Sequence, residues 1–129
     1  MSNDDRNLLA AYRMEQARAA LDEARLLQQA GKTTLGAVNR AYYAMFYAVL
    51  GLLQQSGTVP RKHAGVLALF DSEYVRTGRF DKRYSKYFHH AFNLRQVSDY
   101  HTIEPVDENQ ADELIKNAAE FIQAIQEAL

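Results

Sequence analysis

Residues 35–55, LGAVNRAYYAMFYAVLGLLQQ, decide the fold of this chain. Large apolar side chains recur there every three or four positions and form one stripe, which consists of Val38, Tyr42, Met45, Val49 and Leu52. A stripe of small residues lies beside it and consists of Ala37, Ala41, Ala44, Ala48 and Gly51. Because small side chains let a neighbouring backbone come close, this pattern predicts the central helix of a helical bundle.

Four further segments have helical periodicity, and glycine or proline residues lie between most of them. They run from Leu8 to Gln29, from Lys62 to Val75, from Asp81 to about Asp99, and from Asp107 to near the C-terminus. In the last segment Asp107 and Gln110 have the spacing of a capping box, and Val106 is placed as a staple residue. No alternating, strand-like run is present. The sequence therefore predicts an all-α, antiparallel bundle of about five helices in a single domain over residues 1–129.

Composition narrows the class of protein. The chain has no cysteine, so disulfides, thiolate metal sites and cysteine nucleophiles are excluded. Its first residues are polar and acidic, unlike a signal peptide. The longest apolar stretch, Ala41 to Leu53, is too short to cross a bilayer. We therefore expect a cytoplasmic protein without a membrane span.

Common catalytic motifs are missing. The histidines are His63, His89, His90 and His101, and no two of them have the spacing of a zinc site on one helical face. The sequence also lacks HExxH, GxSxG and the glycine-rich phosphate loops. We therefore predict neither a metal nor a cofactor, and we expect the histidines to be partly exposed polar residues.

The net charge of −1 conceals a strong asymmetry. Residues 61–95 hold eight Lys/Arg against three Asp/Glu, whereas residues 96–129 hold one against eight. The basic part contains a run of cations interleaved with aromatic rings, whose cations are Arg76, Arg79, Lys82, Arg83 and Lys86. Such cations can contact phosphates while the rings stack on bases. Helical periodicity instead favours rings that pack inward, and it leaves the role of the cations open.

The segment Asn93-Leu-Arg-Gln-Val-Ser-Asp-Tyr-His101 places chemically capable side chains at the end of a helix. Arg95 and Asp99 share a face, so one interpretation is a surface ion pair followed by a histidine near the helix end. In the other interpretation, neutral His101 accepts the proton of a ribose 2′-OH and Arg95 stabilises the resulting phosphorane. This transesterification needs no metal. Arg95 and His101 converge only if the helix ends before His101 or if two copies meet across a dimer axis.

Three blocks, in this order and spacing, resemble the short stand-alone prokaryotic proteins of the HEPN family. They are Asn39-Arg-Ala-Tyr-Tyr-Ala-Met-Phe-Tyr-Ala48, then His63 with the Phe70 to Gly78 block, and then Leu94-Arg95 with Asp99-Tyr100. The resemblance covers nearly the whole chain. It implies a homodimeric bundle of about five helices.

Many HEPN proteins carry an arginine and a histidine separated by four to six residues, which form a ribonuclease centre at the dimer interface. Arg95 and His101 have this spacing. The resemblance implies that Arg95 binds the scissile phosphate and that His101 is the general base or acid. It also implies a partner, a small nucleotidyltransferase antitoxin, and Tyr100 is placed where such a partner would add an adenylyl group.

Three functional hypotheses remain open from the sequence. The first is a ribonuclease toxin that uses Arg95 and His101, with RNA held by the basic run. The second is a non-catalytic module that binds a nucleotide or a nucleotidyltransferase through the same cleft. The third is a dimerisation scaffold in which the cluster of Arg95, Asp99 and Tyr100 only ends a helix.

Overall fold

The computed structural model describes residues 2–31, 34–99 and 106–129, with the backbone alone at 97–99. These residues form five α-helices and one π-helical segment, named α1 (Asn3–Ala30), α2 (Thr34–Ser56), α3 (His63–Phe70), η1 (Asp71–Val75), α4 (Lys82–Asp99) and α5 (Glu108–Ala128). The described ranges contain no strand. The prediction of an all-α fold is confirmed.

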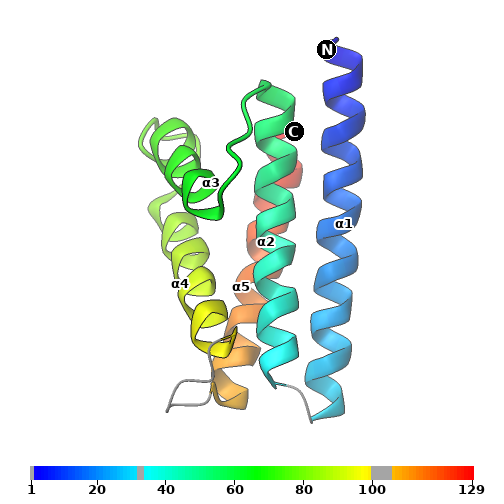
Figure 1. Cartoon of the computed structure of the whole chain (residues 1–129), viewed down its shortest axis with the longest axis vertical. Helices are drawn as coiled ribbons and strands as arrows, with labels where there is room; N and C mark the ends of the chain where they lie inside the picture. The colour runs from blue at the N-terminus through cyan, green and yellow to red at the C-terminus, as the bar shows by residue number, and fades with distance from the viewer. Residues whose placement is uncertain (1, 32–33, 100–105) are drawn as a thin grey trace.

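The four long helices run antiparallel in chain order, as Figure 1 shows. Helix α2 is in contact with α1, α3, α4 and α5, whereas α1 packs against α2 and α5. The predicted central position of this helix is therefore correct. Within the described ranges, no helix combines the length and apolar character that a bilayer crossing requires.

The stripe of small residues on α2 lets α1 approach closely. All five of its members are buried. A Cβ atom added at Gly51 would lie 3.2 Å from the carbonyl oxygen of Ala10 and 3.4 Å from Cβ of Arg13. Since Ala10 and Arg13 belong to α1, the backbones of the two helices meet at this glycine, as the sequence pattern predicted.

The first helix is longer than predicted. It begins at Asn3 instead of Leu8, because the Ser2 hydroxyl oxygen accepts a hydrogen bond from the Asp5 amide at 3.1 Å and caps the helix. Asp4 and Asp5 lie in the first turn, where their negative charges interact favourably with the positive end of the helix dipole. Periodicity of apolar residues does not detect such a polar first turn.

The third predicted helix, from Lys62 to Val75, is divided in the structure. Helix α3 ends at Phe70, and the chain continues as the wider turn of η1, in which the Arg76 amide donates to the carbonyl of Asp71 at 2.8 Å. The Asp71 carboxylate accepts from the Ser85 hydroxyl at 2.7 Å and lies 2.6 Å from Nε2 of His89, both on α4. The change of helix type thus coincides with a polar link to α4.

The last two helices begin where the sequence predicts. The Arg83 amide donates to the Asp81 carboxylate at 2.9 Å, and Asp107 and Gln110 form the capping box. Helix α5 buries the seven apolar residues expected from its periodicity, namely Ala111, Leu114, Ile115, Ala118, Phe121, Ile122 and Ile125. Four aromatic side chains are entirely buried between the helices: Tyr42, Phe70, Phe88 and Phe121.

Candidate functional site

Arg95 lies where α4 faces α2. Its side chain is half-buried, and its guanidinium carbon is 5.3 Å from the ring centroids of both Tyr42 and Tyr43. Guanidinium groups are attracted to the faces of aromatic rings, and the attraction increases as water is excluded. The two tyrosines therefore hold the cation in one place and orient its donors.

The structure also brings His63 into this cluster. His63 is the first residue of α3, and its Nδ1 atom lies 2.7 Å from the hydroxyl oxygen of Tyr42. Its ring stacks on Phe46, with 4.2 Å between centroids and 17° between planes. Tyr43 meets the same ring edge-on at 5.9 Å. Residues from α2, α3 and α4 thus converge on one site.

Burial and the charge of Arg95 shift the pKa values of Tyr42 and His63. Burial is the main cause that raises the pKa of the Tyr42 hydroxyl far above its ordinary value, so the phenol stays protonated. Burial also lowers the pKa of His63 below 6.5, and the positive charge of Arg95 lowers it further. His63 is therefore neutral at pH 7.

A second arginine flanks Tyr43. The guanidinium carbon of Arg40 lies 5.1 Å from the Tyr43 ring centroid, on the same helix. Two neighbours restrain the Arg40 side chain. Its guanidinium group donates a hydrogen bond to the Asn39 side chain at 3.0 Å and lies 3.9 Å from the Glu23 carboxylate. Because Tyr43 is only half-buried, two guanidinium groups and one aromatic ring adjoin the surface.

We call Arg40, Tyr42, Tyr43, His63 and Arg95 the Arg95 site. Guanidinium groups bind phosphate oxygens, and an exposed aromatic edge adds contacts for a base. The site contains cations and donors but, among these five side chains, no carboxylate. It is suited to an anion with an aromatic substituent, such as a nucleotide unit.

Sequence reasoning selected Arg95 but missed His63, Tyr42 and Arg40 as parts of its site. Tyr42 was correctly assigned to the core stripe. A tyrosine at a core position is itself a signal, because its buried hydroxyl group needs a hydrogen-bonding partner. That partner is 21 positions away in the chain, so its identity depended on how α3 folds back onto α2.

The other residues predicted near Arg95 cannot be placed. Tyr100 and His101 lie outside the described residues, and of Asp99 only the backbone is described. Their predicted roles stay predictions.

The structure does not bring the basic run to Arg95. Lys82 and Arg95 lie at opposite ends of α4, about 20 Å apart along the helix axis at 1.5 Å per residue. Arg83 lies 3.2 Å from the Glu120 carboxylate, and Arg79 stacks over the ring of Tyr74 at 4.8 Å. The remaining cations of the run, Arg76, Lys82 and Lys86, are exposed.

The rings of the same run pack inward, as periodicity favoured. Phe80 is buried, and Tyr84 and Tyr87 are partly buried against the core. The Tyr87 hydroxyl donates to the Glu120 carboxylate at 3.2 Å. These rings therefore have a structural role, and all five cations of the run are exposed.

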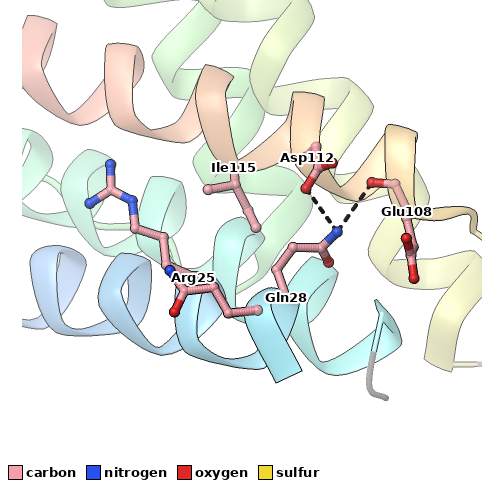
Figure 2. Close-up of a pocket in the computed structure, with 6 residues that line it drawn as sticks. Arg25, Gln28, Glu108, Asp112 and Ile115 are labelled. Carbon is pink, nitrogen blue, oxygen red and sulfur yellow. Dashed lines mark hydrogen bonds between the residues drawn. The ribbon is translucent and has the colours of Figure 1, made fainter. Parts of the chain in front are cut away.

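A polar hollow lies elsewhere, between the end of α1 and the start of α5 (Figure 2). The Gln28 side-chain amide donates to the Glu108 carbonyl at 3.2 Å and to the Asp112 carboxylate at 2.8 Å. These bonds tie the two helix ends together, which gives the hollow a structural role. No group of three or more metal-ligating side chains occurs in the ranges that the structure describes.

The fold and the site together define a small helical domain with a half-buried arginine where two of its helices meet. Comparison of the sequence with families of known proteins agrees: the sequence model of the HEPN domain matches residues 10–128. The chain belongs to the HEPN domain family.

Individual relatives are similar over most of the chain. A UPF0332 protein of Thermotoga maritima is 35% identical over 126 residues, which cover 98% of this chain and 95% of the relative. Two proteins of Methanocaldococcus jannaschii bear the names "Putative toxin MJ0605" and "Putative toxin MJ0142". The first is 35% identical, covering 90% of this chain and 85% of its own length. The second is 36% identical, and the match covers 67% of this chain and 58% of the relative.

Proposed function

We propose that the chain is a toxin that cleaves RNA without a metal ion, with Arg95 on the scissile phosphate and His101 as the general base. The observation that carries this proposal is the position of Arg95, whose guanidinium group lies against Tyr42 and Tyr43 on a half-buried face of the bundle. The names of the two relatives from Methanocaldococcus jannaschii support a toxin.

In the proposed reaction the ribose 2′-oxygen attacks the adjacent phosphorus atom and loses its proton to His101. The P–O bond to the 5′-oxygen breaks, and this oxygen takes up a proton. The products are a 2′,3′-cyclic phosphate and a 5′-hydroxyl. Arg95 neutralises the charge that builds up on the phosphorane oxygens, which is the usual role of a preorganised cation in this type of chemistry.

The site is proposed to be completed by a second copy of the chain. Tyr43, Tyr47 and Phe92 are only partly buried, so α2 and α4 offer aromatic surface, and Tyr43 in this surface lies next to Arg95. A two-fold axis there would make an isologous interface and would bring together two copies of each catalytic group. We further propose a nucleotidyltransferase antitoxin as the partner, with Tyr100 as the residue that it modifies.

The RNA strand is proposed to continue along α4 toward the basic run. Lys82 and Lys86 are exposed on this helix, and Arg76 is exposed just before it. At 1.5 Å per residue, Lys82 lies about 20 Å and Lys86 about 14 Å from Arg95 along the helix axis, so these two cations would hold nucleotides away from the scissile bond. Such contacts raise affinity without selecting a base.

The test is incubation of the purified protein with mixed RNA in EDTA. We expect the wild type to produce fragments with 2′,3′-cyclic phosphate ends. Arg95→Ala and His101→Ala should each lower the rate by at least about a hundredfold, because each removes a group that acts in the transition state. A matched control is Arg25→Ala, which removes an exposed arginine from the hollow between α1 and α5.

Cleavage that all variants share would indicate a contaminating nuclease and would contradict the proposal. Binding of nucleotide or RNA without cleavage would favour the second candidate, a non-catalytic nucleotide-binding module. The specific observation in favour of this candidate is that the guanidinium carbons of Arg40 and Arg95 lie 5.1 and 5.3 Å from the Tyr43 ring centroid, since two cations beside one ring suit a phosphate and a base without needing a reaction.

A further inference from the structure

A carboxylate and an imidazole form a pair on the outside of the bundle, away from the Arg95 site. Nε2 of His89 on α4 lies 2.6 Å from Oδ2 of Asp71, the first residue of η1. The other oxygen of Asp71, Oδ1, accepts a hydrogen bond from the Ser85 hydroxyl at 2.7 Å. Two side chains of α4 thus hold this carboxylate in place.

The carboxylate also determines which nitrogen of His89 carries the proton. An ionised carboxylate only accepts hydrogen bonds, so the hydrogen in the contact with Asp71 belongs to Nε2. In the neutral ring a proton at Nε2 leaves a lone pair on Nδ1. A carboxylate bound to one imidazole nitrogen also raises the basicity of the other nitrogen. Asp71 therefore orients His89 and makes Nδ1 a better nucleophile, as the third group of a triad does.

The pair lies at the surface and on a cationic side of its helix. The His89 side chain is 46% exposed, and the Asp71 side chain is 33% exposed. Lys86 and Lys82 precede His89 by three and seven residues, so they share its side of α4, and both are exposed. Their positive charges favour the approach of an anionic reagent.

His90 provides a comparison within the same chain. It is also exposed on α4, and Lys86 lies one turn before it. The carboxylate of Asp71, however, is bonded to His89. The adjacent histidines thus differ in the contact that would activate one of them.

We propose that Nδ1 of His89 is a phosphoryl-acceptor site whose donor is a phosphoramidate. The Nδ1 lone pair forms a new N–P bond, and the P–N bond of the donor breaks, with its electron pair staying on the leaving nitrogen. In phosphoramidate itself this nitrogen already carries three hydrogens and departs as ammonia. The ring becomes positively charged as the bond forms, and Asp71 stabilises this charge through Nε2–H. Asp71 is a positioning residue, because it touches the imidazole and not the donor.

The chemistry of the donor follows from the site. A neutral nitrogen nucleophile beside two ammonium groups suits an anionic electrophile such as a phosphoryl group. Because the bond that breaks and the bond that forms are both N–P bonds, the transfer is nearly balanced in energy. The inference goes beyond the proposed function and does not depend on RNA binding or cleavage.

The experiment incubates the full chain with potassium phosphoramidate at about pH 8, where an ordinary imidazole is neutral. Intact mass measures how many phosphoryl groups are added, and phosphorus NMR of the adduct identifies the nitrogen that carries each one. Wild type is compared with His89→Gln, His90→Gln and Asp71→Asn. Circular dichroism checks that each variant keeps its helices.

We expect the wild type to gain one phosphoryl group, on Nδ1 of His89, which is lost in acid and retained in base. His90→Gln should react like the wild type, and His89→Gln should not gain this group. Asp71→Asn should react at least about tenfold more slowly, because the carboxylate partner of a histidine typically contributes about that much. Equal labelling of His89 and His90, attachment at Nε2, or no labelling would overturn the inference.

Nitrogen NMR of the unmodified protein tests the role of Asp71 separately from the reaction. In the wild type His89 should be the Nε2–H tautomer at about pH 8, the pH at which a free imidazole is neutral. In Asp71→Asn the signals should indicate a mixture of tautomers. An Nδ1–H tautomer in the wild type, or the same tautomer and labelling rate in Asp71→Asn, would contradict activation by Asp71. The comparison of His89 with His90 in the wild type decides even if Asp71→Asn does not fold.

Discussion

Tyr42 carries a hydroxyl group into the core of the bundle, where its side chain is 0% exposed. An unpaired hydroxyl there would cost about 1–3 kcal/mol, and the hydrogen bond between this hydroxyl and Nδ1 of His63 offsets the cost. The same contact draws a histidine out of water and places it near Arg95. At the scale of single residues, one buried polar group thus links core stability to the electrostatics of the Arg95 site.

The lowered pKa of His63 predicts a pH dependence of stability. The folded protein holds His63 neutral, whereas in the unfolded chain its pKa returns to about 6.5. As pH falls through this value the unfolded state binds more protons than the folded state, so the free energy of unfolding should decrease. Urea unfolding at about pH 7.5 and about pH 5.5 measures this, and His63→Gln should have the smaller pH dependence. Equal pH dependence in the two proteins would contradict it; His90→Gln is the control.

At the scale of the elements, the close approach of α1 and α2 at Gly51 predicts a sensitive position. Gly51→Val places methyl groups against the Ala10 carbonyl oxygen, 3.2 Å from the added Cβ, and should lower the free energy of unfolding by about 2 kcal/mol. Ala19→Val, at an exposed position of α1, should cost only about 0.5 kcal/mol through helix propensity. Urea unfolding of both variants measures the two losses in free energy of unfolding. Equal losses would contradict the prediction, because they would show that the two helices can move apart at Gly51 without cost.

At the scale of the whole molecule, the partly buried aromatic surface of α2 and α4 predicts a homodimer. Tyr43, Tyr47 and Phe92 pack against the core but stay partly exposed, and a second copy would cover them. Light scattering at micromolar concentration should give twice the chain mass, and a monomer would contradict the prediction. Tyr47→Arg, which places a charge on this surface, should shift the protein toward monomer while circular dichroism stays helical.

The sequence by itself determined the helices and their inward faces. The stripes on residues 35–55, the capping box at Asp107 and the seven buried positions of α5 follow from spacing along one helix, which is a local property. The first turn of α1 escaped prediction because Ser2 caps it with a polar side chain. The division of the third helix escaped because Asp71 bonds to residues of α4.

Only the tertiary structure decided the composition of the Arg95 site. Spacing selected Arg95, but its neighbours come from α2 and α3, and no local rule specifies which ring of a bundle faces which cation. The same limit applies to the basic run, which was predicted to hold RNA: its residue Lys82 begins α4, about 20 Å along the helix axis from Arg95. Helix periodicity is set within a few turns, whereas a site between helices depends on how the whole chain packs.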